Sequence, residues 1–315
     1  MKVLVTGSCG FIGTNLCERL LSEGHEVIGI DDFSGKYPKK TYFENLGALS
    51  LSNGRKFSFF GWSVLDRKKM LSLSSKGITH VVHLAARTGV RDSVENPEDY
   101  LKVNVIGALN VLDLCVAAGV KGAVFASSSS VYGKNPVPFR ETMPTNSPLS
   151  PYAASKIAME ALVHSYSHVH GLNANVLRFF TVYGPRGRQD MAVFRFAKLI
   201  TRGKPLTIFG DGSSKRDFTY VGDIVNGIML ALVKCNGFNV FNLGCSSPVE
   251  VRRIVSLLEE NLGKKAAVVN AGANSADVDE TFADISKARA ELGYSPKTAI
   301  EKGIEEFVAW FNKSQ

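Results

Sequence analysis

The sequence predicts an α/β fold in which a doubly wound parallel sheet is accompanied by a smaller α+β lobe. In the first 180 residues, short apolar runs rich in β-branched residues alternate with segments of helical periodicity. Strands that alternate with crossover helices form parallel sheets. After Gly184 the alternation loosens, and the length of 315 residues with 45% hydrophobic content allows two domains.

The expected elements before residue 181 are six strands and four helices. The strands are Lys2–Thr6, Glu26–Asp31, Lys56–Phe60, Thr79–Leu84, Gly122–Ser127 and Ala174–Phe179. The helices are residues 11–22, 66–75, 97–118 and 152–169. In this order they describe consecutive strand–helix–strand units, which wind to both sides of one sheet.

The rest of the chain predicts mostly helices, at residues 190–202, 222–233, 249–262, 284–292 and 298–312. Short strands such as Leu206–Phe209 and Val240–Leu243 lie between them. We place one domain at residues 1–180, joined by part of 217–243, and a smaller lobe at 181–315. No low-complexity linker separates them, so the two parts should share a cleft.

The charge of the chain is compatible with small anionic ligands. The net charge is +8 and the pI is near 9.2, but the 37 Lys and Arg residues are scattered without a block of five like charges. We therefore expect no nucleic-acid partner.

The cysteines and the N-terminus predict a soluble cytoplasmic protein. The five cysteines show no C-x-x-C spacing and suggest free thiols in a reducing compartment. No N-terminal leader pattern is present, and no stretch is expected to approach a membrane span of roughly 18 apolar residues.

The stretch "VLVTGSCGFIG" places Gly7, Gly10 and Gly13 between the first strand and the first helix. Such glycines let the backbone approach a pyrophosphate at a helix N-terminus. A glycine-rich turn that serves packing alone is the alternative. The second strand ends in Asp31 and Asp32, where a carboxylate can bind ribose hydroxyls and would repel a 2′-phosphate, so NAD is favoured over NADP.

A second group of polar residues follows the fifth strand. Tyr152 and Lys156 lie four apart and share a face of the next helix, and serines close the strand before it. Taken separately, these residues are more often surface pairs and turn formers. Together they can act as a base, because a nearby lysine and a nicotinamide cation would lower the pKa of a tyrosine.

Several motifs in this chain resemble those of the NAD-dependent nucleotide-sugar epimerase/dehydratase family, which belongs to the extended short-chain dehydrogenase/reductases. The resemblance covers essentially the whole chain. The motifs are "TGSCGFIG", "HLAA", "NVIGALNVL", "SSSSVYG", "YAASK", "RFFTVYGP", "RDFTYVGDI", "FNLG" and "LGYSP". It implies a Rossmann-type NAD-binding domain at 1–180 and a nucleotide-sugar-binding lobe at 181–315.

The resemblance implies roles for matching positions. Ser128, Tyr152 and Lys156 would be the catalytic triad. The NAD contacts would be Gly7, Gly10, Phe11, Ile12, Gly13, Asp31, Asp32, Ser63, Val64, Leu84, Ala85, Ala86 and Asn104, together with Tyr152 and Lys156. The substrate contacts would be Ser129, Ser130, Thr181, Arg188, Met191, Arg216 and Asp277.

Two positions depart from the family pattern. Ser63 stands where the family has an acidic residue that reads adenine. The segment Asn274–Val278, which contains Asp277, stands where relatives carry a phosphate-binding arginine before a G-D-V triplet. That substitution leaves more of the diphosphate contact to Arg216.

The reaction that the resemblance implies is epimerisation at C4 of a UDP-sugar through a 4-keto intermediate, with NAD tightly bound. Dehydratases and decarboxylases of the family carry carboxylates where this chain has Ser129 and Ser130. The stretch "FFTVYGPRGRQDM" is similar to UDP-glucuronate 4-epimerases, and Arg188 with Thr181 would bind the sugar carboxylate. The alternatives are a 4-epimerase of neutral UDP-hexoses, including N-acetyl forms, and a non-catalytic NAD- or RNA-binding relative.

The remaining candidate residues are expected to have structural or solvent-exposed roles rather than catalytic ones. Arg186 is expected to be a solvated loop charge and Arg178 a structural residue at the end of a core strand. His164 and His168 are too few to hold a metal, so no metal is expected. The apolar face that includes Val105, Leu109, Leu112 and Val116 predicts core or subunit contacts, and the family resemblance implies a homodimer.

Overall fold

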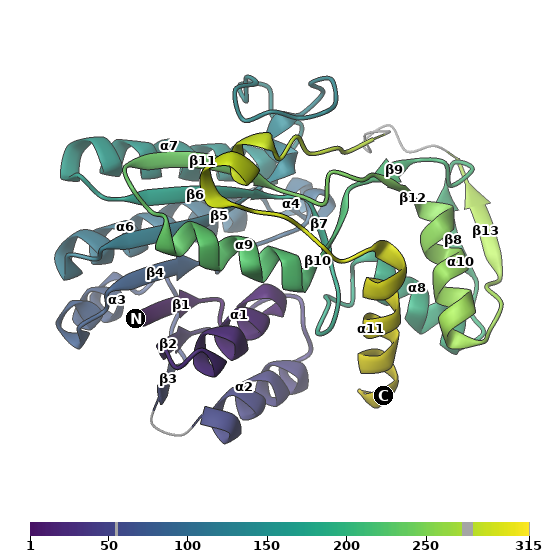
Figure 1. Ribbon diagram of the computed structural model, residues 1–315, viewed down its shortest axis with the longest axis horizontal. Coiled ribbons are helices and arrows are strands. Elements are labelled where there is room, and N and C mark those ends of the chain that lie inside the picture. Colours follow the sequence, from purple (N-terminus) through teal and green to yellow (C-terminus); the bar gives the residue numbers. More distant parts are fainter. Residues whose placement is uncertain (54–55, 273–279, 315) are drawn as a thin grey trace.

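The computed structural model describes residues 1–53, 56–272 and 280–314. Its centre is a seven-stranded parallel sheet in the order β11-β6-β5-β4-β1-β2-β3 (Figure 1). The strands are β1 (Lys2–Thr6), β2 (Glu26–Ile30), β3 (Phe57–Phe60), β4 (His80–His83), β5 (Gly122–Ser128), β6 (Ala174–Phe179) and β11 (Phe238–Leu243). The predicted doubly wound sheet is confirmed.

The sheet is buried on both faces, which explains why its strands read as continuous apolar runs rather than alternating ones. Val3, Leu4 and Val5 of β1 are all fully buried. Val3 and Val5 belong to one hydrophobic core, whereas Leu4 belongs to a second core on the opposite face. This division follows from the two-residue period of a strand.

Helices cover each face of the sheet. The first core includes side chains of α1 (Phe11–Ser22), α2 (Lys39–Asn53) and α9 (Val221–Val233). The second includes side chains of α3 (Arg67–Ser72), α6 (Gly107–Ala118) and α7 (Pro151–His170). The other elements of this part are η2 (Leu73–Lys76), α4 (Val90–Glu95), α5 (Pro97–Leu101), the π-helix η3 (Lys102–Ile106) and η4 (Ser129–Tyr132).

A third core holds the smaller lobe together and includes Phe194, Ile208, Leu258, Phe307 and Phe311. In Figure 1 its helices and short strands gather at one end of the large sheet. The elements are β7 (Thr181–Tyr183), α8 (Ala192–Thr201), β8 (Leu206–Phe209), β9 (Lys215–Arg216), β10 (Phe218–Tyr220), β12 (Val249–Glu250), α10 (Val251–Leu262), β13 (Val268–Ala271) and α11 (Ile300–Lys313). The segment η5 (Ala288–Leu292) instead packs in the first core, beside α9 and β11. The expected strand Val240–Leu243 lies in β11 of the large sheet, while the domain division at residue 180 stays a prediction.

Several elements differ from the sequence-based expectation. Helices α2 and α4 were not expected, and α2 has almost no amphipathic periodicity to reveal it. The expected helix 97–118 is formed by α5, a π-helical turn and α6. The helix expected at 284–292 is largely the π-helical segment Ala288–Leu292.

The helical run Pro97–Ala118 is long and apolar enough, by length and composition alone, to cross a membrane. The expectation that no stretch approaches a membrane span is therefore wrong on that criterion. The apolar content has another use here, because Ala108, Val111 and Leu114 are fully buried in the second core.

Candidate active site

The loop between β1 and α1 leaves no room for a side chain at Gly7 or at Gly13. Gly7 has φ +70°, and a Cβ added there would lie 2.8 Å from the Ala85 backbone nitrogen. A Cβ on Gly13 would lie 2.0 Å from the Gly7 carbonyl oxygen. Helix α1 starts after Gly10 without a side-chain cap, so its first turn can offer backbone N–H groups to a phosphate.

Asp31 is buried at the carboxyl end of β2 and supports this loop. Its Oδ2 accepts a hydrogen bond of 3.0 Å from the Cys9 backbone, and its Oδ1 accepts one of 2.9 Å from Phe33. Burial raises the pKa of Asp31 to about 6. Asp32 is exposed, and burial raises the pKa of the Cys9 thiol to about 12, so that thiol is not ionised at neutral pH.

The loop after β4 passes beside the glycine loop. The Ala85 backbone donates to Thr6 Oγ1 at 3.2 Å. Asn104, which is 1% exposed, clamps the same loop, because its Oδ1 accepts from the Arg87 backbone at 2.7 Å and its Nδ2 donates to Arg87 oxygen at 3.0 Å. Asn104 therefore positions the loop that carries the predicted cofactor contacts Leu84, Ala85 and Ala86.

The proposed adenine side is formed by Ser63 and Val64 after β3. The Ser63 carbonyl accepts a hydrogen bond from the Asp66 backbone at 3.1 Å and starts a turn. Val64 is buried, and its carbonyl accepts from Asn110 Nδ2 at 2.9 Å. Their contact with adenine stays a prediction.

The serine and the tyrosine of the predicted triad meet where the end of β5 lies beside the start of α7. Ser150 caps α7 by accepting from the Ala153 backbone at 3.1 Å, and Pro151 occupies its first turn. This start places Tyr152 in the first turn, where burial raises its pKa while a hydrogen bond with Ser128 and the charge of Arg188 lower it. Ser128 Oγ also accepts from Ser130 Oγ at 3.0 Å.

Lys156 is 4% exposed and donates to the Ala126 carbonyl oxygen at 2.8 Å. Burial lowers its pKa to about 8, against the opposing charge of Glu160. The cation whose charge lowers the pKa of Tyr152 in this structure is Arg188, so an effect of Lys156 on the tyrosine stays a prediction. Arg188 lies in the loop between β7 and α8 of the smaller lobe, close enough to Tyr152 for its charge to act on the tyrosine hydroxyl.

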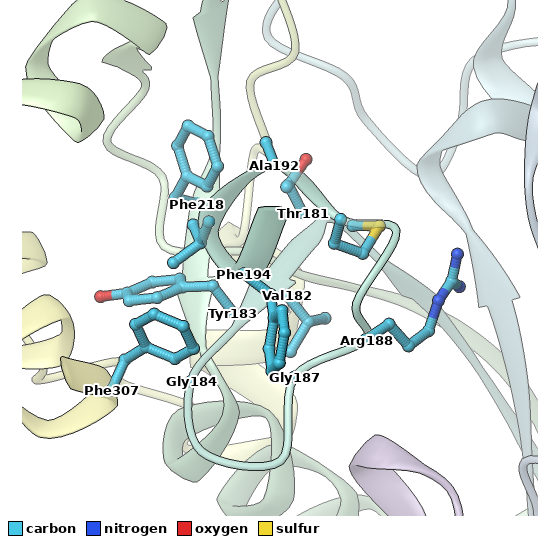
Figure 2. Close-up of a pocket in the computed structure, with 12 residues that line it drawn as sticks. Thr181, Val182, Tyr183, Gly184, Gly187, Arg188, Ala192, Phe194, Phe218 and Phe307 are labelled. Atoms are coloured by element: carbon cyan, nitrogen blue, oxygen red, sulfur yellow. The ribbon is translucent and has the colours of Figure 1, made fainter. Parts of the chain in front are cut away.

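Thr181, Arg188 and Met191 line one pocket at the carboxyl end of β7 (Figure 2). Its apolar wall includes Phe194 and Phe307, and Arg188 extends away from these rings in the figure. The guanidinium of Arg188 contacts both Asp190 and Thr88. Thr181 and Arg188, the predicted carboxylate pair, are therefore neighbours, but the cavity of about 10 Å³ is too small for a sugar. Their contact with the substrate stays a prediction.

Two other arginines near Arg188 in the sequence, Arg178 and Arg186, have structural roles. The expectation that Arg186 is a solvated loop charge is wrong: its side chain is 21% exposed, it pairs with Glu18, and it contacts Asn45 Oδ1 at 3.4 Å. Its φ of 63° is unusual for a residue with a side chain, and its carbonyl accepts from Tyr37 Oη at 2.7 Å. Arg178 is buried against Glu160, as a structural role requires.

Sequence reasoning missed the partners that hold these charges. Glu160 accepts from Arg178 and from Ser127, and its spacing of four from Lys156 on one helix was a usable signal. Asp190 lies two residues after Arg188 in the same motif, which could also have indicated a pair. Thr88 and Lys36 are distant in sequence and gave no signal.

The remaining predicted contacts are not joined into one site by the described geometry. Arg216 lies on β9 of the smaller lobe and donates to the Lys215 carbonyl at 2.9 Å. Ser129 and Ser130 begin η4 beside the triad. Asp277 lies outside the described residues. Within residues 1–53, 56–272 and 280–314, no group of three His, Cys, Asp or Glu side chains could hold a metal.

A family model for the NAD dependent epimerase/dehydratase family matches residues 3–244. The chain belongs to this epimerase/dehydratase family. The UDP-glucuronate 4-epimerase of Thermodesulfobacterium geofontis (strain OPF15) is 43% identical over 309 residues, covering 98% of this chain and 95% of the relative.

Solved structures of the epimerase/dehydratase type are similar over the full length. A UDP-glucuronic acid 4-epimerase from Bacillus cereus in complex with UDP-glucuronic acid and NAD has a TM-score of 0.93 and 37% identity, covering 100% of both chains. A UDP-glucose 4-epimerase from Thermotoga maritima with UDP-glucose has a TM-score of 0.90 and 34% identity, covering 100% of this chain and 99% of the other.

This epimerase/dehydratase uses NAD, and the described residues fit that cofactor. The uncapped start of α1 suits the pyrophosphate, and the carboxylate of Asp31 suits the hydroxyls of the adenosine ribose. When bound, NAD supplies the hydride acceptor and donor for redox chemistry at a sugar carbon. Tyr152 and Ser128 can hold and exchange the proton of the reacting oxygen.

We expect the affinity for NAD to fall as the pH drops below about 6, the pKa of the buried Asp31. Protonation removes the carboxylate charge, and hydrogen bonds to a charged acceptor are about twice as strong as neutral ones. Calorimetric titration of NAD-free protein between about pH 5 and pH 8 measures this linkage. Asp31→Asn should bind NAD weakly without this pH dependence, and an equal pH dependence in both proteins would contradict the assignment.

Proposed function

We propose that this protein is an NAD-dependent UDP-glucuronate 4-epimerase that interconverts UDP-glucuronate and UDP-galacturonate. The observation that carries the substrate is Arg188, which lies beside Thr181 and whose charge lowers the pKa of the Tyr152 hydroxyl. A carboxylate bound to this arginine would place the sugar ring beside the catalytic tyrosine.

In the proposed reaction the chain itself holds and moves one proton. Tyr152 takes the proton of the sugar 4-hydroxyl as the C4 hydride leaves, and it returns a proton when the 4-keto sugar is reduced on its other face. Ser128 hydrogen-bonds the tyrosine and can hold the same sugar oxygen. Ser129 and Ser130 stand where the dehydratases and decarboxylases that this family resembles carry carboxylates, which favours simple epimerisation.

Incubation of the purified protein with UDP-glucuronate should yield UDP-galacturonate, and no conversion would overturn the proposal. Arg188→Ala should then lose about 1–3 kcal/mol of transition-state stabilisation for the uronate, judged from kcat/KM. Arg195→Ala, which removes an exposed arginine of α8, is the control.

The competing function is epimerisation of neutral UDP-hexoses. It is favoured by the likeness to the Thermotoga maritima enzyme with UDP-glucose. In that case Arg188→Ala would change kcat/KM for UDP-glucose little, and the wild type would prefer UDP-glucose to UDP-glucuronate. A non-catalytic RNA-binding relative would instead bind RNA in a salt-sensitive way.

We also propose a homodimer. Exposed apolar side chains occur on neighbouring helical segments at Val94, Leu101, Ile106 and Val116. A second copy that covered these side chains would remove them from water. Sedimentation velocity measures the oligomeric state, and a monomer at micromolar concentration would contradict the homodimer.

We propose that the protein is located in the cytoplasm, because all five cysteines are free thiols. Cell fractionation tests this location.

A further inference from the structure

We propose that Thr88 and Asp190 are positioning residues for Arg188, and that together they fix how its guanidinium meets the carboxylate of a hexuronate substrate. This inference rests on the function proposed above and deepens it. It concerns residues that hold the arginine rather than residues that touch the reacting atoms.

Asp190 binds the side edge of the guanidinium through two bonds. Arg188 Nε donates to Asp190 Oδ1 at 3.0 Å, and Nη2 donates to Oδ2 at 2.7 Å. Thr88 Oγ1 accepts from Nη1 at 2.6 Å. Within the described part of the chain, these contacts use three of the five N–H groups and leave one on each terminal nitrogen. A pair of N–H groups on one guanidinium is what a carboxylate binds in a bidentate way.

The two positioning residues are themselves anchored. Asp190 Oδ2 lies 3.4 Å from Lys36 Nζ, and Lys36 also pairs with Asp92. Lys36 follows β2, Thr88 follows β4, and Arg188 and Asp190 follow β7. Three loops therefore meet at the pair of Arg188 and Asp190. Such a network restricts the rotamers of a long side chain more than a single ion pair does.

Thr88 connects the arginine to the catalytic tyrosine. The Thr88 carbonyl accepts from Tyr100 Oη at 2.9 Å. The Tyr100 ring packs edge-on against the Tyr152 ring, with centroids 6.1 Å apart. Thr88 therefore contacts Arg188 through its side chain and Tyr100 through its backbone carbonyl, and it joins the arginine to the tyrosine that packs against Tyr152.

The charge balance explains why Asp190 is needed before substrate arrives. The Arg188 side chain is only 20% exposed, and a covered cation without a partner is costly. Asp190 neutralises the guanidinium from its side edge, so the arginine keeps this conformation before substrate binds. A substrate carboxylate can then bind the remaining N–H groups without displacing Asp190.

The test compares variants that differ by one acceptor. Thr88→Val removes the acceptor with little change of shape, and Thr88→Ser retains it. We expect Thr88→Val and Asp190→Ala to raise KM for UDP-glucuronate about tenfold with little change in kcat. The inhibition constant of UDP, which has no sugar, should stay unchanged, and Thr88→Ser should behave as the wild type.

Three results would overturn the inference. A lower KM in Asp190→Ala would mean that the aspartate competes with the substrate carboxylate. An unchanged KM in Thr88→Val would mean that Thr88 does not position the arginine, and an equal weakening of UDP would mean that the loss does not concern the carboxylate. Melting temperatures separate these results from misfolding.

Calorimetry keeps this inference separate from the proposed function. A wild type that binds UDP-glucuronate without epimerising it would overturn the function, and the binding constants of the variants would then judge the positioning role. A wild type that epimerises UDP-glucuronate, with variants that keep its KM, would overturn the positioning role alone. If the wild type binds UDP-glucuronate no better than UDP, both fall.

Discussion

Tyr152→Phe is expected to lose about 10²- to 10⁴-fold in kcat, the usual contribution of a general base, while NAD stays bound and the melting temperature is unchanged. Ser128 and Arg188 lower the pKa of the hydroxyl that this substitution removes. The phenylalanine ring keeps the packing against Tyr100. Steady-state turnover of UDP-glucuronate measures the loss.

The matched control for this variant is Tyr166→Phe on the same helix. The Tyr166 hydroxyl donates to Asp113 Oδ1 at 2.7 Å and takes no part in the site, so this variant should turn over normally. If Tyr152→Phe retained more than about a tenth of wild-type kcat, the tyrosine would not be the base, because general bases contribute more.

Glu160→Gln is expected to lower the free energy of unfolding by about 3–5 kcal/mol, since it leaves Arg178 as a buried cation without a carboxylate partner. Arg178 Nη2 lies 2.7 Å from Glu160 Oε2, and the two side chains are only 5% and 9% exposed. Glu160 Oε1 also accepts from Ser127 Oγ at 2.5 Å. Urea unfolding, followed by circular dichroism, measures the change.

An exposed ion pair supplies the comparison for the buried one. Glu98 and Lys102 lie 2.6 Å apart, with side chains 79% and 57% exposed. Glu98→Gln should leave the free energy of unfolding nearly unchanged. Equal effects of the two substitutions would show that burial of the Arg178 pair does not matter.

The fold and the triad could be predicted from local patterns. The strands of the large sheet are covered on both faces, so each had to be a continuous apolar run, as β6 is. Tyr152 and Lys156 were found because a spacing of four places them on one face of a helix, and the family resemblance gave them their roles. Asp31 was found because its place at a strand end defines its chemistry.

The partners of the loop arginines could not be predicted in the same way. Arg186 pairs with Glu18 of α1, 168 residues away, and only the folded chain brings them together. Arg188 and Thr181 were predicted as a pair and do lie together, but the contact of Arg188 with Thr88 spans 100 residues. A solvated loop charge and a buried loop charge look identical in a sequence, because their exposure is decided by distant elements.

The positions of the two arginine pairs have a consequence for how this enzyme can evolve. Arg178 and Glu160 tie the catalytic helix to the sheet from within the core, and Glu160 lies one turn beyond Lys156. Mutation there would damage the chemistry and the fold together. Arg188 instead sits on a surface loop with polar partners, where exchange of a few residues leaves the core intact. Selection can therefore alter the sugar that is accepted while the reaction itself is inherited unchanged.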